Sequence, residues 1–174
     1  MAEVGYARFS GREVAKRAGY SVGTIYNVFG SLEGLLAAIN THTFGLWAAR
    51  LEQEMADNSA DRIASLVRGY FGFALDNPNC WSAIYEHKLP QGAQLSEKDM
   101  EGRARLTQIV ENEVAAALPA DTAIDIARYA RSLIAGVHGH CSYVVSGSFA
   151  LLDETDPIGS ALARVRESLA FHQN

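Results

Sequence analysis

The sequence predicts an all-α protein. Apolar residues recur every three or four positions along most of the 174 residues, which is the spacing of an amphipathic helix. Prolines fall between these periodic stretches, as at Asn77-Pro78 and Asp156-Pro157, where they end or begin helices. With 48% apolar and 20% charged residues, the chain has the composition of a globular protein with a sizeable core.

The first predicted helix is short. Ser10 and Glu13 have the spacing of a capping box, which satisfies free backbone donors at a helix start. Gly19 stands where a left-handed residue would end the helix. Its small apolar face is formed by Val14, Ala15 and Ala18.

A second short helix follows after a tight turn. Ser21 is its predicted cap, Ile25 and Phe29 have the spacing to face inward, and Gly30 ends it. A helix, a three-residue turn with glycine and a second helix form the arrangement that places the second helix in a DNA major groove.

These residues also carry a resemblance. Arg12-Glu-Val-Ala-Lys-Arg-Ala-Gly, then Ser21-Val-Gly-Thr-Ile-Tyr-Asn and Phe29-Gly-Ser, closely resemble the tetracycline-repressor (TetR) family of one-component transcriptional regulators. The match covers roughly residues 5–40. It implies a helix-turn-helix DNA-binding domain over residues 1–45, joined to a helical ligand-binding and dimerisation domain over residues 46–174.

The resemblance makes Val22 to Phe29 the recognition helix. Thr24 can contact a thymine methyl group or a phosphate, and Asn27 suits an adenine edge. Tyr26 resembles the phosphate-contacting tyrosine of the family. The expected DNA-binding residues, including those that hold the backbone from the flanks, are Ser10, Arg12, Ser21, Gly23, Thr24, Tyr26 and Asn27. The alternative is that they are solvated polar residues on a short helix.

The charge distribution supports a DNA-binding head. Residues 1–30 hold four basic and two acidic side chains, a net charge of +2. Because the whole chain carries −5, the remainder carries −7. A basic module on an acidic body is typical of a DNA reader attached to another domain, although chance clustering of four cations would look the same.

The head departs from the family in two respects. A full helix precedes Gly5-Tyr6 in the family, whereas Met1-Ala-Glu-Val makes about one turn, so either the given chain begins late or the head is shortened. Val28 and Leu32 stand where members commonly carry phosphate-binding residues, so DNA affinity should be lower and less dependent on salt. A TetR-like ligand-binding or interaction protein with a degenerate head is therefore the alternative.

Beyond residue 30 the pattern predicts further helices separated by polar or proline-containing segments. A long helix should run over residues 31–57, and Pro90 and Gly92 should lie in a loop. The remaining expected helices cover residues 63–77, 78–86, 96–118, 121–146 and 157–172, and the last three should start at Ser96, Asp121 and Asp156. The helix over 121–146 is apolar or small on much of its surface, as at Ala135 and Gly136, and should be buried on several sides.

The body is expected to bind a small molecule and to dimerise, as the family resemblance implies. The candidate pocket residues are Trp47, Phe71, Trp81, Tyr85, His138 and Cys141, although each could simply belong to the core. No cluster of charged residues is evident for such a pocket, so the expected effector is apolar. The helices over 121–146 and 157–172 should pair with those of a second copy.

The sequence gives little support for a metal-binding protein, an enzyme or a membrane-spanning protein. His138 and His140 point to opposite sides of a helix and cannot readily chelate one metal ion, and no cofactor or catalytic motif is present, so a helical-bundle enzyme is a weak alternative. Cys80 and Cys141 lack paired spacing, and no apolar run reaches the roughly 20 residues of a membrane span, which suggests a cytoplasmic protein. We expect a repressor that binds double-stranded operator DNA as a homodimer and is released by a small apolar effector.

Overall fold

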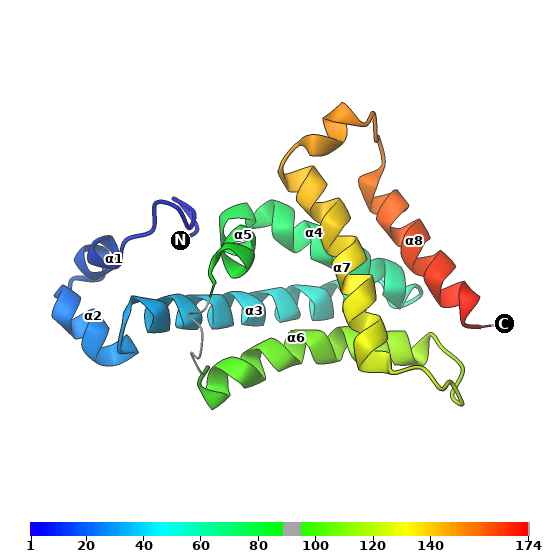
Figure 1. Ribbon diagram of the computed structural model, residues 1–174, viewed down its shortest axis with the longest axis horizontal. Coiled ribbons are helices and arrows are strands. Elements are labelled where there is room, and N and C mark those ends of the chain that lie inside the picture. The colour runs from blue at the N-terminus through cyan, green and yellow to red at the C-terminus, as the bar shows by residue number, and fades with distance from the viewer. Residues whose placement is uncertain (89–94, 174) are drawn as a thin grey trace. The chain divides into compact units, whose positions relative to one another are not determined.

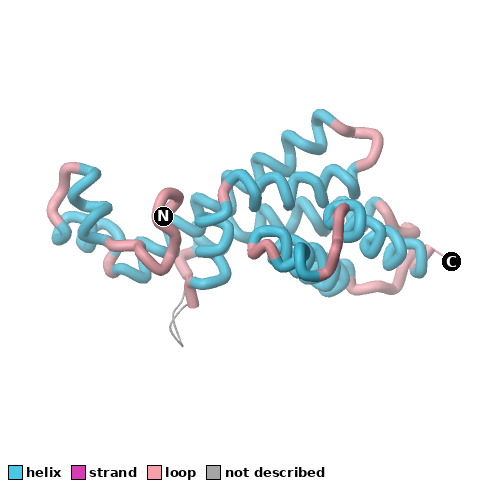
Figure 2. Tube along the Cα trace, turned by 90° about the horizontal axis from the view of Figure 1, so that it is seen from above, coloured by secondary structure: helices cyan, strands magenta, loops and turns pink. Residues whose placement is uncertain are grey.

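The computed structural model describes residues 1–88 and 95–173, and within these ranges the chain is helical without strands, as predicted (Figure 2). The predicted loop at Pro90 and Gly92 lies outside the described residues. The α-helices, labelled in Figure 1, are α1 Gly11–Ala18, α2 Val22–Phe29, α3 Leu32–Asp57, α4 Arg62–Asp76, α5 Pro78–Glu86, α6 Glu97–Ala116, α7 Ile126–Val145 and α8 Pro157–Phe171. A short 3₁₀ helix, η1, spans Ser148–Leu151 between α7 and α8.

Residues 1–46 and 77–104 form the first of two compact units. α1 and α2 pack together with the beginning of α3 around a small core of Ala15, Ile25 and Leu35, at whose edge Phe29 lies as predicted. α3 begins very close to α2, since a Cβ atom at Gly34 would lie 1.9 Å from the carbonyl oxygen of Phe29. Glycine at this position therefore sets the corner between the two helices.

Residues 47–76 and 105–174 form the second unit. α7 runs alongside α8, and α4 packs against both (Figure 1). Aromatic rings fill the core: the Trp47 ring is stacked on Phe73 with 5.2 Å between centroids and meets Tyr70 edge-on at 4.6 Å. The apolar residues spaced three or four apart along α4 and α8 are buried or half-buried here, namely Ile63, Leu66, Val67, Tyr70, Phe71, Ala74, Ile158, Ala161, Leu162, Val165 and Leu169.

The outer face of α7 differs from expectation. Ala135 and Gly136 are exposed, so within one chain this helix is not buried on several sides. Ala130, Val137 and Cys141 line its inner face and are buried. The small residues on the other side are left for a contact outside the chain or for solvent.

Helix starts were predicted with mixed success. Ser96 and Asp156 each accept a hydrogen bond from the backbone N–H three residues ahead, as predicted. Ser10 has extended backbone but its side chain makes no capping bond, so the predicted capping box with the solvent-exposed Glu13 does not form. The helix expected from residue 121 begins at Ile126, because Asp125, not Asp121, caps it by accepting from the Arg128 N–H at 3.0 Å.

Candidate functional site

The turn between α1 and α2 fixes the geometry of the helix pair. Gly19 has a φ of 74°, in the left-handed region, and its N–H donates to the Lys16 carbonyl at 3.2 Å. The next N–H, of Tyr20, donates to the Ala15 carbonyl at 2.9 Å. This pair of bonds is a Schellman motif, which closes α1 and directs the chain into α2.

The N-terminus of α2 holds two hydroxyl groups together. The Ser21 Oγ accepts from the Thr24 N–H at 3.0 Å, and the two hydroxyl oxygens lie 2.9 Å apart. Ile25 is buried on the opposite side, which leaves Gly23, Thr24 and Asn27 exposed. The helix is therefore anchored on one side and presents its polar residues to solvent on the other.

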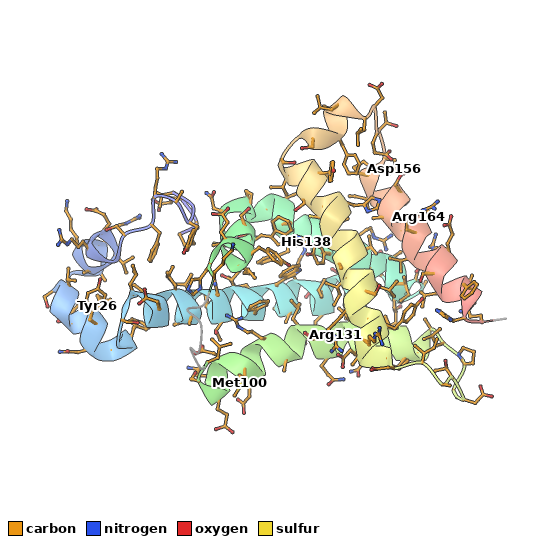
Figure 3. All side chains as sticks on the ribbon, viewed as in Figure 1. Tyr26, Met100, Arg131, His138, Asp156 and Arg164 are labelled. Carbon is orange, nitrogen blue, oxygen red and sulfur yellow. The ribbon has the colours of Figure 1, made fainter. Side chains whose placement is uncertain are left out.

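Tyr26 is partly supported by α1. A Cβ atom at Gly11 would lie 3.4 Å from the Tyr26 Oη, so the phenol group rests over the first residue of α1, and 37% of the tyrosine stays exposed (Figure 3). Gly11 is buried, and a larger residue there would push against the ring. The tyrosine is thus held against the beginning of α1 with part of its surface open.

The residues in and beside α1 include the predicted phosphate-binding residue Arg12 and an ion pair between Arg17 and Glu3. Arg12 is exposed and Ser10 is half-buried. Arg17, in the last turn of α1, donates to both carboxylate oxygens of Glu3 at 2.7 and 2.8 Å. Val28 is 70% exposed at the end of α2 and supplies no charge.

The second unit contains a small apolar cavity of about 40 Å³. Tyr70 is its polar wall residue, and the Tyr70 hydroxyl lies 3.0 Å from the His138 Nδ1. Burial lowers the pKa of His138, so the imidazole is neutral near pH 7. The cavity is lined by Leu51, Ile63, Leu66, Val67, Tyr70, Val110, Val114, Leu133, Ile134, Val137 and Val165.

Two other hollows are open to solvent. One of about 760 Å³ lies in the first unit at the corner between α2 and α3, and its walls include Glu33, Lys98 and Asp99. Such a charged rim does not suit an apolar ligand. The other, a groove of about 290 Å³ on α7 and η1, is lined by Ala135, Gly136, Gly139, His140, Tyr143, Phe149 and Leu152.

Comparison with known proteins decides the family. Residues 63–165 match the family described as Tetracyclin repressor-like, C-terminal domain, and residues 1–39 match that described as Bacterial regulatory proteins, tetR family. The chain belongs to the TetR family. TetR proteins are transcriptional regulators with a helix-turn-helix domain, so the regulator class and the fold predicted from the sequence are confirmed.

Individual relatives agree with this assignment. The chain is 29% identical over 131 residues to the HTH-type transcriptional regulator BetI of Vibrio campbellii, covering 71% of this chain and 65% of BetI. It thus spans a little under two thirds of that curated relative. A protein of unknown function from Rhodococcus sp. RHA1 has a similar fold, with a TM-score of 0.72, 23% identity and coverage of 99% of this chain and 89% of that one. The fold is also similar to that of a protein described as the regulatory protein SCO4313, with a TM-score of 0.70 and 22% identity. That match covers 94% of this chain and 87% of the other.

The ligand-binding residues predicted for this TetR protein are distributed over both units. Trp81 and Tyr85 belong to the first unit, with ring centroids 5.3 Å apart, and the other four belong to the second. Trp47, Phe71, Trp81 and Cys141 are buried, whereas His138 is half-buried and Tyr85 is 44% exposed. Burial raises the pKa of Cys141 to about 12, so the thiol stays protonated. None of the six residues lines the three hollows described above, and the ligand pocket at these residues stays a prediction.

The sequence interpretation missed a buried polar pair in the first unit. Asn40 is 2% exposed and His87 is 9% exposed, and the Asn40 Nδ2 lies 3.2 Å from the His87 Nδ1. A signal for Asn40 was available, because it shares the core spacing of Leu36, Thr43 and Trp47 along α3. A polar residue at a core position is the informative case, since burial must be compensated by hydrogen bonds.

The described residues meet neither the requirement of a metal site nor, in any single helix, that of a membrane span. Within the described ranges, no His, Cys, Asp and Glu side chains gather in a group of three or more that could hold a metal ion. Over the same residues no single helix has the length and hydropathy of a membrane span, and α2 with α3 passes that test only as a pair bent by 68°.

Proposed function

We propose that this TetR protein is a transcriptional repressor that binds operator DNA through α2. The observation that carries the proposal is the presentation of α2, with Ile25 buried in the head core and Gly23, Thr24 and Asn27 exposed. Such a helix can enter a major groove, where threonine and asparagine read base edges. Arg12 on α1 and Tyr26 on α2 itself would contact phosphates.

We propose further that two copies pair through α7 and α8. Ala135 and Gly136 are exposed on α7, and Phe171 at the end of α8 is 79% exposed. Small residues let two helices approach closely, and the groove beside them offers Tyr143 and Phe149 as apolar contacts. A homodimer would present two recognition helices to the two half-sites of an operator.

The proposed effector is a small apolar molecule bound in the second unit. The cavity there has apolar walls, and the hydroxyl of Tyr70 could accept or donate one hydrogen bond. Because an engineered cavity of about 150 Å³ is known to admit benzene, a cavity of about 40 Å³ must widen to admit a ring. Widening would move helices packed around it, which is a means of coupling binding to DNA release.

DNA binding is tested with duplexes that the full-length protein selects from a random library, by fluorescence anisotropy at fixed salt. Thr24→Ala and Asn27→Ala should each weaken binding to the selected site by about tenfold. Thr155→Ala, at an exposed threonine of the second unit, is the control and should leave affinity unchanged. If the protein selects no duplex, it is a ligand-binding member with a degenerate head; if Thr24→Ala and Tyr26→Ala do nothing, α2 is not the recognition helix.

Dimerisation is tested by sedimentation at micromolar concentration. Gly136→Arg should yield a monomer, because a side chain at Gly136 meets nothing in its own chain but would obstruct a second copy. Ala49→Arg, at another exposed helix position, should leave the dimer intact. A wild-type monomer would contradict the proposal.

The effector site is tested with toluene and p-cresol, which differ by one hydroxyl group. Both should raise the melting temperature of the wild type, and Val137→Phe should abolish the effect by filling the cavity. Trp81→Ala distinguishes this cavity from the pocket predicted from the sequence. It should weaken binding only if the ligand lies among the predicted residues. Unchanged stabilisation in Val137→Phe would rule out this cavity.

A further inference from the structure

The pair formed by Asn40 and His87 leaves two buried polar atoms without a protein partner. Among the residues that the structure describes, neither the Asn40 Oδ1 nor the His87 Nε2 has a hydrogen-bond partner. Both side chains are more than nine-tenths buried, and they come from different elements, α3 and the C-terminal end of α5. Buried polar atoms of this kind are costly unless something satisfies them.

The pair is complementary whichever way its protons are assigned. If the Asn40 amide donates to the His87 Nδ1, then His87 offers an Nε2–H donor and Asn40 offers a carbonyl acceptor. If the amide is reversed, the donor and the acceptor exchange places. Either way one donor and one acceptor remain, which a ligand with both kinds of group can satisfy together.

One positive charge, that of Arg103, acts on the pair. Arg103, on α6, lies over the ring of Phe44 with 5.2 Å from its guanidinium carbon to the ring centroid. Burial lowers the pKa of His87, and the positive charge of Arg103 lowers it further, so His87 is neutral near pH 7. The facing carboxylate of Asp99 already accepts hydrogen bonds from Thr41 and Ser96, each at 2.6 Å.

The remaining charged and aromatic neighbours define the walls. Glu33 acts on His87 in the opposite direction from Arg103, but its side chain is exposed to solvent. The Tyr6 ring lies 6.1 Å from the imidazole, and the turn that carries it is tied to α5 by a hydrogen bond from the Asn79 Nδ2 to the Ala2 carbonyl at 2.6 Å. One aromatic ring, that of Tyr6, therefore lies beside the imidazole, and the charge of Arg103 acts on it.

We propose that Asn40, His87 and Arg103 form a second small-molecule site, which takes a small carboxylate bearing a hydroxyl group, of the 2-hydroxy acid class. The ligand carboxylate accepts from the His87 Nε2–H and is held by the charge of Arg103. The ligand hydroxyl donates to the Asn40 Oδ1. The proposal goes beyond the apolar effector, since this site lies in the other unit and selects a charged polar molecule.

The experiment titrates lactate into the full-length protein without DNA and follows the imidazole nitrogen signals of His87 by NMR. Lactate should shift them saturably. Propionate, which lacks the hydroxyl, should bind about tenfold more weakly because it leaves the Asn40 Oδ1 unpaired. Lactamide, which keeps the hydroxyl and a carbonyl oxygen but lacks the charge, should also bind more weakly because it loses the attraction of Arg103. Since no DNA is present, failure here does not bear on operator binding, and failure of operator binding does not bear on this site.

Variants separate recognition from a structural role. Asn40→Leu should weaken lactate binding by about tenfold or more, whereas Asn58→Leu, at an exposed asparagine, should not. The double variant Asn40→Leu with His87→Phe should abolish binding while its melting temperature stays equal or rises, because apolar groups replace both polar partners. Absence of any saturable shift with wild type, which means that only ordered water satisfies the pair, would overturn the proposal, as would tighter binding of propionate than of lactate.

Discussion

The two compact units bury different chemistry along the same helix. In the first unit α3 buries two polar residues, Asn40 and Thr43, both under 4% exposed, beside apolar residues such as Leu35. In the second unit its buried residues are apolar and include Trp47, Leu51 and Met55, each 5% exposed or less. The spacing of the inward positions is the same in both halves, so the contrast lies in residue type and not in helix geometry.

This contrast indicates which unit contributes most to folding stability and which contributes to ligand specificity. Apolar and aromatic burial stabilises in proportion to the area removed from water, so the second unit should contribute most of the folding free energy. Buried polar groups stabilise little on balance, but they define which partner can fit. His138 beside the apolar cavity bonds Tyr70, whereas His87 keeps one nitrogen without a partner among the described residues.

The largest expected effect is a loss of stability on substitution of Phe71 in the aromatic core of the second unit. Phe71 is fully buried, so Phe71→Ala should lower the free energy of unfolding by about 3–5 kcal/mol through lost burial and the cavity it leaves. Tyr85→Ala removes an aromatic ring that is 44% exposed, so its effect should be much smaller. Urea denaturation measures both. Equal losses in the two variants would mean that stability is not concentrated in the second unit.

The next largest effect is a loss of DNA affinity on substitution of Gly34, at the corner between α2 and α3 in the first unit. Gly34→Ala would place a Cβ atom 1.9 Å from the Phe29 carbonyl oxygen, so the corner between α2 and α3 must open. Because a misplaced recognition helix loses base contacts, affinity for the selected duplex should fall by about tenfold or more. Gly45→Ala is the control on the same helix: a Cβ atom there meets nothing within 4 Å, and alanine should stabilise by about 0.5–1 kcal/mol.

If Gly34→Ala and Gly45→Ala bind the duplex equally well, the position of α2 relative to the beginning of α3 does not matter for DNA recognition. If both weaken binding, the effect comes from α3 as a whole. Anisotropy with the selected duplex, at one salt concentration, distinguishes these outcomes.

The sequence predicted the elements that depend on local chemistry. The cap at Ser96, the proline at the start of α8 and the left-handed Gly19 are determined by nearby residues, and all are found. Ser10 shows the limit of such reasoning, because a capping residue can occupy the right position without turning its hydroxyl toward the helix. The start of α7 was misplaced because Asp121 and Asp125 are both plausible caps and only the folded chain selects one.

The candidate sites were less predictable because they depend on tertiary contacts. Asn40 and His87 are 47 positions apart, and no local pattern pairs them. The exposed Ala135 and Gly136 were expected to be buried, since a sequence does not distinguish burial within a chain from a surface available to a second copy. The exposed side of α2 could be predicted because one buried residue, Ile25, determines which residues face outward.

A smaller effect concerns pH and the two histidines His87 and His138. The pKa values of His87 and His138 are both lowered, chiefly by burial, so the unfolded chain binds more protons than the folded one below about pH 6.5. Stability is therefore present above that pH and is lost as pH falls through the ordinary histidine range. The melting temperature should drop between pH 7.5 and 5.5, and His138→Gln or His87→Gln should each reduce the drop. A melting temperature that rises on acidification would contradict the assignment of His87 and His138 as neutral histidines with lowered pKa values.

The smallest expected effect concerns charge at the surface of the head. Val28 is 70% exposed at the end of α2, so a longer side chain at this position can extend into solvent. If α2 enters the major groove, this end of the helix approaches the phosphate backbone, and Val28→Arg would add one phosphate contact. The slope of log affinity against log salt should then steepen by about 0.9, with affinity rising a few-fold at low salt. Val28→Gln is the neutral control of similar length, and its slope should equal that of the wild type. An unchanged slope in Val28→Arg would mean that the C-terminal end of α2 points away from DNA, and the docking proposed for the recognition helix would have to be reversed.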